Sequence, residues 1–174
     1  VFTSSGSWTV PDSVTSALVQ VYGAGGNGAG WYSSGPVTYW FSSGGYGAYA
    51  CVLLTGLISG TTYTVTIASG GSNSATSLGS LIVCNAGGNA SGSIPGTNGT
   101  ATIISGSVIS QSALGVTQSQ INMTTGSYAS RWNSYTNWKI QYTPPGGLLD
   151  SFMYGAAQTD GIASANQGAI AIIY

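Results

Sequence analysis

The sequence predicts an all-β fold: a single antiparallel β-sandwich, jelly-roll-like, with ordered glycine-rich loops. Three observations predict it. Apolar and polar residues alternate in several short segments, Gly- and Pro-rich turn signals separate these segments, and helical periodicity is poor. With 174 residues, 43% of them hydrophobic, the chain is long enough for one domain with a sizeable core, so we assign residues 1–174 to one domain.

The strand candidates follow one another along the chain. The clearest is 61–69, "TTYTVTIAS", in which Tyr, Val and Ile alternate with Thr as in a half-buried strand. In a second candidate, Ala17, Val19 and Val21 fall on one face. The best helical candidate is 107–125, although Ser, Thr and β-branched residues make it a weak one. Further strands are expected at 7–10, 47–55, 80–84, 100–104 and 168–174.

Two glycine-rich tracts, 23–47 and 86–99, each follow a strand. The sequence at the end of the first strand is "GAGGN" (23–27), and that at the end of the second is "NAGGN" (85–89). A flexible Gly/Ser linker has few aromatic residues, whereas residues 22–49 hold eight. Large rings are costly to leave exposed in a mobile loop. We therefore predict ordered tracts in which glycine lets polyproline-II-like segments lie close together. A collagen triple helix is excluded, because the three-residue repeat is absent.

A phosphate-binding loop is the alternative for the first tract. Gly23, Gly25 and Gly28 fit a G-x-G-x-x-G pattern after a strand. However, a helix should follow, and an acidic residue about twenty positions later should hold a ribose. The segment instead continues "AGWYSSGPVTYW", and the single acidic residue before residue 150 is Asp12. We therefore predict no nucleotide cofactor.

Charge limits the partners. Charged residues make up 3% of the chain and the net charge is −1, whereas nucleic-acid binding requires clustered Lys and Arg. No apolar run is long enough to span a bilayer. The sequence therefore predicts neither nucleic-acid binding nor membrane insertion. A surface with so few charges is expected to respond little to pH or salt, which would suit a protein outside the cell. The chain begins at Val1 rather than Met, so we expect an N-terminus that is processed or incomplete.

Catalytic groups are scarce. There is no His, Lys139 is the single Lys, and the acidic residues are Asp12, Asp150 and Asp160. A nucleophilic triad lacks its base, and oxygen-ligand metal sites need several carboxylates close together. We expect the aspartates to be turn or cap residues, Asp12 in a turn with Pro11. The chain is thus predicted to be no enzyme and to hold no cofactor or metal.

Two features leave alternatives open. Cys51 and Cys84 form one disulfide in an oxidising compartment, or, as we favour, they are two buried apolar side chains. Glycosylation triplets begin at Asn89, Asn98 and Asn122, but such triplets arise by chance in this composition and matter only if the host glycosylates.

Aromatic residues supply the candidate partner or glycan surface. In 128–142 they recur every three or four residues around Arg131 and Lys139, as on a helix face or on strands joined near Ser134. Rings, amides and a guanidinium suit polysaccharide, whereas packing against other subunits or the core is the interpretation we favour. The candidates are Trp31, Tyr32, Tyr39, Trp40, Phe41, Tyr128, Arg131, Trp132, Tyr135 and Trp138.

The motifs of the first hundred residues resemble a known family. "FTSSGSWTVPDSVTSALVQVYGAGGNG", "SSGGYGAYACVLL", "GTTYTVTIASGG" and "TSLGSLIVCNAGG", with "QGAIAIIY" at the end, are similar to the glycine-rich domain of phage tail-fibre, adhesin and other virion proteins. The chain departs from the family at Ser13, where Gly is usual. Residues 105–165 also replace a further glycine tract. The resemblance covers residues 2–104 and 166–174.

This resemblance implies a compact β-sandwich at a virion surface, often acting in host attachment. We therefore expect an extracellular, virion-surface structural protein: a fibre tip, spike or capsid decoration that binds without catalysis. The expected partners are further copies of the chain, other virion proteins, and a host surface glycan or protein. The alternatives are a subunit of a self-assembling extracellular filament or sheath, and a carbohydrate-binding module.

Overall fold

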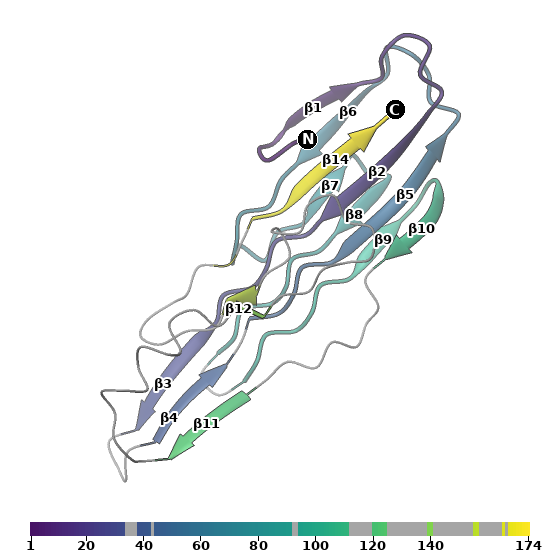
Figure 1. Cartoon of the computed structure of the whole chain (residues 1–174). Helices are drawn as coiled ribbons and strands as arrows, with labels where there is room; N and C mark the ends of the chain where they lie inside the picture. Colours follow the sequence, from purple (N-terminus) through teal and green to yellow (C-terminus); the bar gives the residue numbers. More distant parts are fainter. Residues whose placement is uncertain are drawn as a thin grey trace.

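The computed structural model describes residues 1–33, 38–42, 44–91, 94–111, 120–124, 139–140, 155–156, 165 and 167–174. All regular structure in these ranges is β-strand, and no helix there is long and apolar enough to cross a membrane. Two antiparallel sheets pack together as a β-sandwich, which confirms the predicted fold class (Figure 1). The jelly-roll comparison and the single-domain assignment stay predictions.

The strands form two larger and two smaller sheets. The first sheet has the order β10-β5-β2-β14 and contains β10 (Ser107–Gln111), β5 (Tyr49–Thr55), β2 (Ser16–Tyr22) and β14 (Ala169–Ile173). The second has the order β1-β6-β7-β8-β9 and contains β1 (Gly6–Thr9), β6 (Thr62–Thr66), β7 (Thr76–Leu78), β8 (Ile82–Cys84) and β9 (Ala101–Ile103). The smaller sheets are β11-β4-β3, from β11 (Gln120–Thr124), β4 (Thr38–Ser42) and β3 (Ala29–Ser33), and β12-β13, from β12 (Lys139–Ile140) and β13 (Gly155–Ala156).

The helical candidate at 107–125 is wrong at both of its ends. β10 occupies the first end and pairs with β5, while β11 occupies the second and pairs with β4. The β-branched and hydroxyl residues that make this segment a poor helix suit strands. Residues 105–165, which stand in place of a further glycine tract, therefore contribute β10 to the sandwich and β11 to the sheet that contains β3 and β4.

The core lies between the two larger sheets and follows the predicted alternation. Ala17, Val19 and Val21 of β2 are buried together with Leu78 and Ile82 of the facing sheet. Tyr22 and Tyr49, which are opposed on β2 and β5, form a second buried cluster with Cys51. Because neighbouring residues of a strand lie on opposite faces, this second cluster belongs to the outer face of the first sheet.

The turn before β2 contains a residue with strained backbone. Val14 N–H donates to the Pro11 carbonyl oxygen at 3.3 Å, and Ser13 has a φ of 67°, in the left-handed region. Ser59 Oγ donates to Asp12 Oδ1 at 2.6 Å, so Asp12 is a turn residue, as predicted. The left-handed backbone at Ser13 is a conformation that glycine adopts without steric cost.

Replacing Ser13 by Gly is expected to stabilise the protein slightly. A left-handed conformation costs a residue with Cβ about 1–2 kcal/mol, but glycine loses about 0.5–1 kcal/mol more backbone entropy on folding. The net gain in the free energy of unfolding should be at most about 1 kcal/mol, or about 2–4 °C in Tm, measured by thermal unfolding. Asn73→Gly is the matched control: Asn73 also has a positive φ, 57°, but Asn tolerates it better. A lower Tm for Ser13→Gly than for the wild type would contradict the strain argument.

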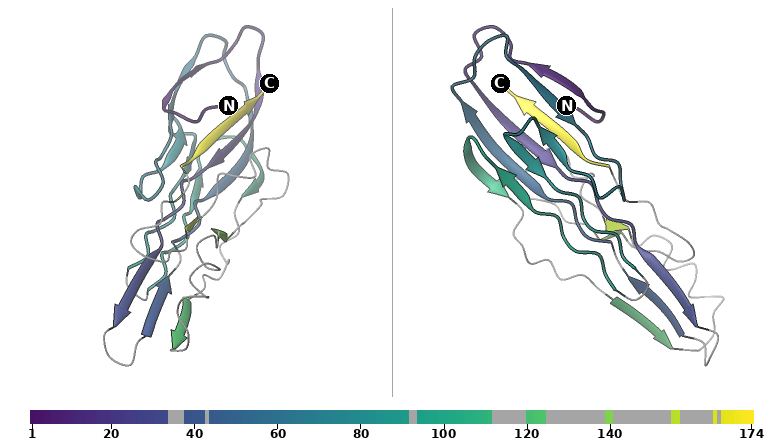
Figure 2. Two further views of the ribbon diagram at one scale, coloured as in Figure 1. Left: turned by 60° about the vertical axis from the view of Figure 1, so that its left-hand side comes forward. Right: turned by 180° about the vertical axis from the view of Figure 1, so that it is seen from behind.

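The molecule is elongated, with the sandwich at one end and β3, β4 and β11 at the other (Figures 1 and 2). Both chain termini lie in the sandwich half, where Phe2 bridges to Ile170 of β14. The sheet of β3, β4 and β11 is therefore the end of the molecule away from both termini. The glycine tracts connect the two ends.

Candidate functional site

One long hairpin, residues 16–55, carries β3 and β4 away from the sandwich. β2 and β5 form its base, and β3 and β4 form its outer part. Between them, two main-chain hydrogen bonds of 2.7 and 2.9 Å join the legs. The register is unchanged from the pair Ser16 and Thr55 to the pair Ser33 and Thr38, so the sandwich fixes which residues face each other in the outer part. The successive partners are Tyr22 and Tyr49, Gly23 and Ala48, Gly26 and Gly45, and Ala29 and Ser42.

A second hairpin extends β8 and β9 of the other sheet in the same manner. Asn85 N–H donates to Thr100 at 3.0 Å, and Gly88 N–H donates to Thr97 at 2.7 Å. Ser91 and Ile94 close the series as an isolated bridge. In both hairpins the bonded residues are three positions apart, which is the number of residues per turn in polyproline II. The polyproline-II-like conformation itself stays a prediction.

The two hairpins are hydrogen-bonded to each other through their main chains. Gly45 N–H donates to Gly88 and Ala48 N–H donates to Asn85, both at 2.9 Å. Gly87 N–H donates to the carbonyl of the first tract at Ala24, at 2.9 Å. Stacked β-sheets lie about 10 Å apart, with side chains between them. Here the layers bond directly, so the side-chain core of the sandwich gives way to a core of backbone.

Close approach, rather than unusual dihedral angles, explains the glycines of these tracts. A Cβ added to Gly26 or to Gly96 would overlap the carbonyl oxygen of Gly88, and one added to Gly45 would overlap that of Thr97. None of the three has a positive φ. The obstructing atoms are backbone and are themselves hydrogen-bonded, so a side chain cannot be accommodated by a change of rotamer.

Asparagine side chains join the tracts at their edges. Asn89 Oδ1 accepts from Asn27 N–H at 2.7 Å, while its Nδ2 donates to the Gly71 carbonyl at 2.9 Å. Asn98 Oδ1 accepts from Tyr46 N–H at 3.1 Å. The glycosylation triplets at Asn89 and Asn98 thus contain asparagines with structural contacts, and the nitrogen of Asn89 that a glycan would occupy is already a hydrogen-bond donor.

The outer sheet brings together the five aromatic candidates of the first tract. Trp40, on the central strand β4, is opposed by Trp31 on β3 and by Asn122 on β11. Tyr39 is opposed by Tyr32 and, on β11, by Met123. Opposed residues share a face of an antiparallel sheet, and consecutive residues lie on opposite faces. The register therefore divides the aromatic residues into two sets, one on each face.

The sequence interpretation missed β11 as part of this site. In "QINMT", Gln, Asn and Thr alternate with Ile and Met, which is the signal that indicates a strand. The remaining candidates lie outside the residues that the structure describes, and their contribution to a binding surface stays a prediction. They are Tyr128, Arg131, Trp132, Tyr135 and Trp138.

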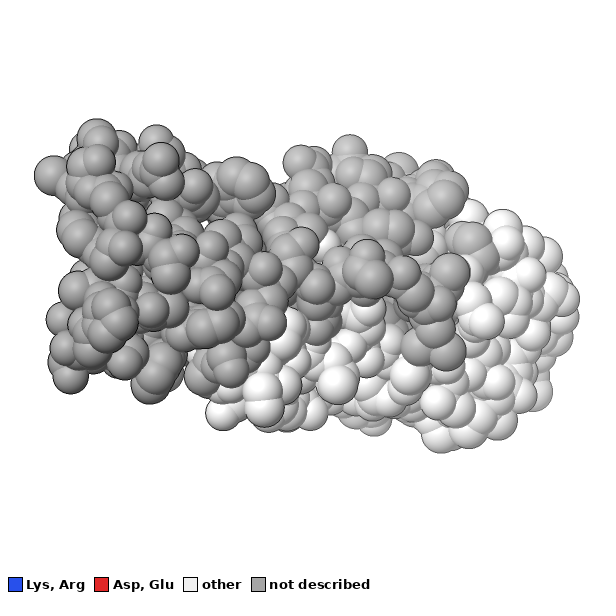
Figure 3. Space-filling view, turned by 90° about the horizontal axis from the view of Figure 1, so that it is seen from below, with Lys and Arg blue, Asp and Glu red and all other residues white. Residues whose placement is uncertain are grey.

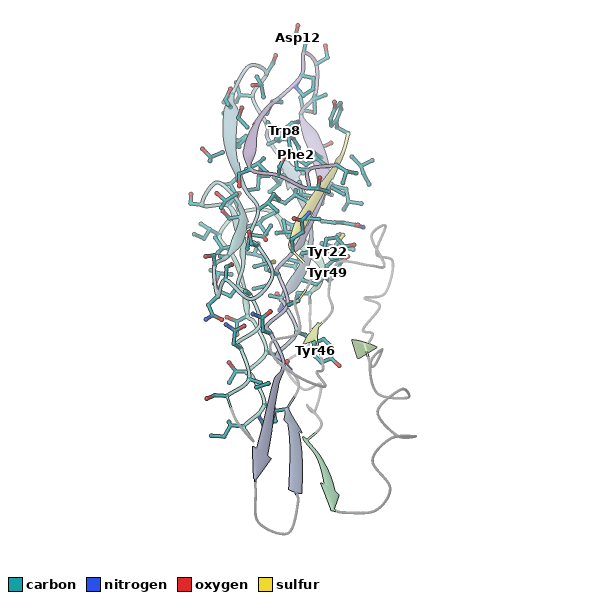
Figure 4. The ribbon with its side chains drawn as sticks, turned by 90° about the vertical axis from the view of Figure 1, so that its left-hand side faces the viewer. Phe2, Trp8, Asp12, Tyr22, Tyr46 and Tyr49 are labelled. Atoms are coloured by element: carbon teal, nitrogen blue, oxygen red, sulfur yellow. The ribbon has the colours of Figure 1, made fainter. Side chains whose placement is uncertain are left out.

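Charge is almost absent from the described surface. Asp12 is the one charged side chain among those that the structure describes, and it lies at the tip of the sandwich (Figure 4). Below it in the same view come Phe2 and Trp8, then Tyr22 and Tyr49, and then Tyr46, near the start of β3. The described part of the face in Figure 3 has no acidic or basic side chain. Any ligand of the outer sheet must therefore be recognised without help from these residues' charges.

The two cysteines are free and buried. Cys84 belongs to the core between the sheets, with its Sγ 3.5 Å from the Val21 carbonyl oxygen, whereas Cys51 belongs to the cluster on the outer face of the first sheet. The first sheet thus lies between them. The structure therefore has two buried thiols rather than the alternative disulfide.

Burial raises the pKa of the Cys84 thiol to about 12. The thiolate is the reactive form, so Cys84 is expected to resist an aromatic disulfide reagent at pH 8 and to react once the chain is unfolded in guanidinium. The Cys51→Ala variant isolates the signal of Cys84. The contribution of this thiol to stability should be constant below about pH 8 and should fall as the pH rises toward 12, because the unfolded thiol then loses its proton first. Rapid labelling of this variant under native conditions would contradict the burial.

Comparison with known proteins adds no family to these observations. No protein-family model matches the chain, and no curated protein is significantly similar to it. The motif resemblance described above therefore remains an expectation, and the geometry of the outer sheet is the main guide to function.

Proposed function

We propose that this protein is a structural component of a virion surface, a fibre tip, spike or capsid decoration, that helps attachment to a host by non-catalytic binding. One observation supports this proposal best. An uncharged, aromatic sheet lies at the end of an elongated molecule, away from both termini, on a connection made of hydrogen-bonded backbone (Figure 1). The family resemblance adds the virion setting.

The physical argument concerns how such a sheet binds. Aromatic side chains offer a large contact area at a low cost in conformational entropy. A connection with many main-chain hydrogen bonds holds the sheet that carries them in a defined orientation, which reduces the entropy lost on binding. With so little charge, association is not steered over long distances. Attachment would then depend on many copies on one particle, whose combined avidity exceeds the affinity of a single site.

Assembly into a homo-oligomer or with other virion proteins has its own support. Among the described strands, β10 lies at an edge of the first sheet, and Val108 and Ile109 on it are exposed, as is nearby Ile104. The strand has neither charged residues nor prolines, which commonly protect an edge from pairing, and its one protective feature is a register shift between Val108 and Ser110. The same edge favours the second candidate function, a subunit of an extracellular filament or sheath.

The experiment that separates these functions locates the native assembly. Antibodies against the purified chain are expected to label the outer surface of virus particles in electron micrographs, and native mass spectrometry should give an oligomer of finite symmetry. Labelling of open helical fibres on cells would favour the filament instead. Labelling confined to the cell interior, or release of sugars from host polysaccharide by the purified chain, would contradict the proposal.

A further inference from the structure

β14 is the last strand of the chain and lies beside β2 in the first sheet. Five consecutive pairs join the two strands, from Ala169 with Tyr22 to Ile173 with Leu18. The first three residues of β14 are buried, and Phe2 forms a bridge to the strand on its other side. The C-terminal strand is therefore held within the sandwich from both sides.

The chain leaves the β2–β14 pair at opposite ends. β2 ends at Tyr22 and continues through the first glycine tract to β3, whereas β14 ends beside Leu18, one residue before Tyr174. In an antiparallel pair the hydrogen bonds run perpendicular to the strands. A pull on the outer sheet against the C-terminus therefore slides the two strands past each other and loads all five pairs together.

The glycine tracts transmit such a pull through hydrogen-bonded backbone. Within the first hairpin, Gly23 N–H donates to Ala48 at 2.7 Å and Gly26 N–H donates to Gly45 at 2.9 Å. Gly45 N–H in turn donates to Gly88 of the second hairpin at 2.9 Å. The legs follow the long axis of the molecule (Figures 1 and 2), so bonds between the legs cross the direction of the pull. One leg can slide past the others only if several of these bonds break together.

We propose that this protein is a load-bearing element that resists tension along its long axis. A pull on the sheet of β3, β4 and β11 is resisted in shear by the β2–β14 pair and by the main-chain bonds of the tracts. The inference goes beyond the proposed function, because it holds whatever the outer sheet contacts. A molecule fixed through its sandwich half and held at its other end would keep its fold under a load that, in another direction, would separate the same strands one pair at a time.

Single-molecule force spectroscopy of the full-length chain tests the inference by pulling one strand pair in two directions. A handle on a cysteine added after Tyr174 is combined with a second handle, either on Ser33→Cys in β3 or on Ser16→Cys at the start of β2. The Ser33 handle shears the β2–β14 pair. The Ser16 handle pulls from the same end of the pair as the C-terminus and unzips it. Cys51 and Cys84 are buried, so the added thiols take the handles in the folded protein.

We expect the rupture force, at the same loading rate, to be several-fold higher with the Ser33 handle than with the Ser16 handle. The physical reason is that five pairs share the load in shear, whereas unzipping loads the pairs in turn. Equal rupture forces in the two geometries, or a lower force with the Ser33 handle, overturn the inference.

Matched variants show whether the force depends on the loaded strand or on overall stability. Ile170 on β14 and Ile82 on β8 are both fully buried in the core between the sheets, and replacing either by Val removes one methylene. With the Ser33 handle, Ile170→Val should lower the rupture force, and Ile82→Val should leave it nearly unchanged. Denaturant unfolding measures the loss of stability in each variant. An equal drop in rupture force for both variants would show that the force reports overall stability, and it would overturn the inference.

Discussion

Gly45→Ala is expected to destabilise the protein by about 3 kcal/mol, the upper end of the usual cost of overpacking. The added Cβ would overlap the carbonyl of Thr97 and approach Gly88 N to 3.0 Å. Since Gly88 is also the hydrogen-bond acceptor of Gly45 N–H, relief of the overlap stretches that bond. Chemical denaturation should show the loss, and Tm should fall by about 6–12 °C.

Gly6→Ala is the matched control for Gly45→Ala. Gly6 lies in a strand, and a Cβ added to it meets no atom within 4 Å. Alanine also reduces the entropy of the unfolded chain, so this variant should be as stable as the wild type or slightly more so. Equal stability of the Gly45→Ala and Gly6→Ala variants would show that the layers of main chain are not in close contact.

Trp8→Ala is expected to cost about 4 kcal/mol, within the range for truncating a buried aromatic residue. Trp8 is 7% exposed and belongs to the core between the sheets. Its ring stacks on Tyr63, with centroids 5.9 Å apart, and contacts the ring of Tyr174 at 6.3 Å. The variant removes both ring contacts and leaves a cavity beside β6. Denaturant unfolding followed by circular dichroism measures the effect.

Tyr174→Ala tests which of the two ring contacts matters. Tyr174 is 67% exposed, so its truncation should change the free energy of unfolding by less than about 1 kcal/mol. Trp8→Phe retains a ring and should fall between the two variants. If Tyr174→Ala costs as much as Trp8→Ala, the stabilisation comes from holding the last residue in place rather than from filling the core.

The sequence predicted the sandwich where side chains alone determine structure. Alternation in β2 and β6 identified the buried residues, because a two-residue period leaves one face apolar. The alternation pattern did not reveal β7 (Thr76–Leu78), which is too short for a periodic signal. It also gave the wrong secondary structure for 107–125, where strand and helix patterns compete.

The glycine tracts show what a side-chain pattern cannot predict. The tracts pair through main-chain N–H and carbonyl groups, and every residue has both except proline, which lacks the N–H. The sequence therefore indicates that backbone segments lie close together, but it does not indicate which segments pair. The five aromatic candidates of the first tract all lie on β3 and β4, and their role as a binding surface stays a prediction. Their division between two faces required the register of β3 and β4, and Asn122 joined them only through the pairing of β11.

The three-residue spacing of the bonds sets a rule for how this connection changes length. One or two residues inserted into a single leg would bring side chains where carbonyls now lie and would shift the pairing of every later residue. Three residues added to each of the four legs together would restore both, and would move the sheet of β3, β4 and β11 outward by about 9 Å if the legs have polyproline II geometry. The reach of the molecule can therefore grow only in steps of three residues, added to all four legs at once.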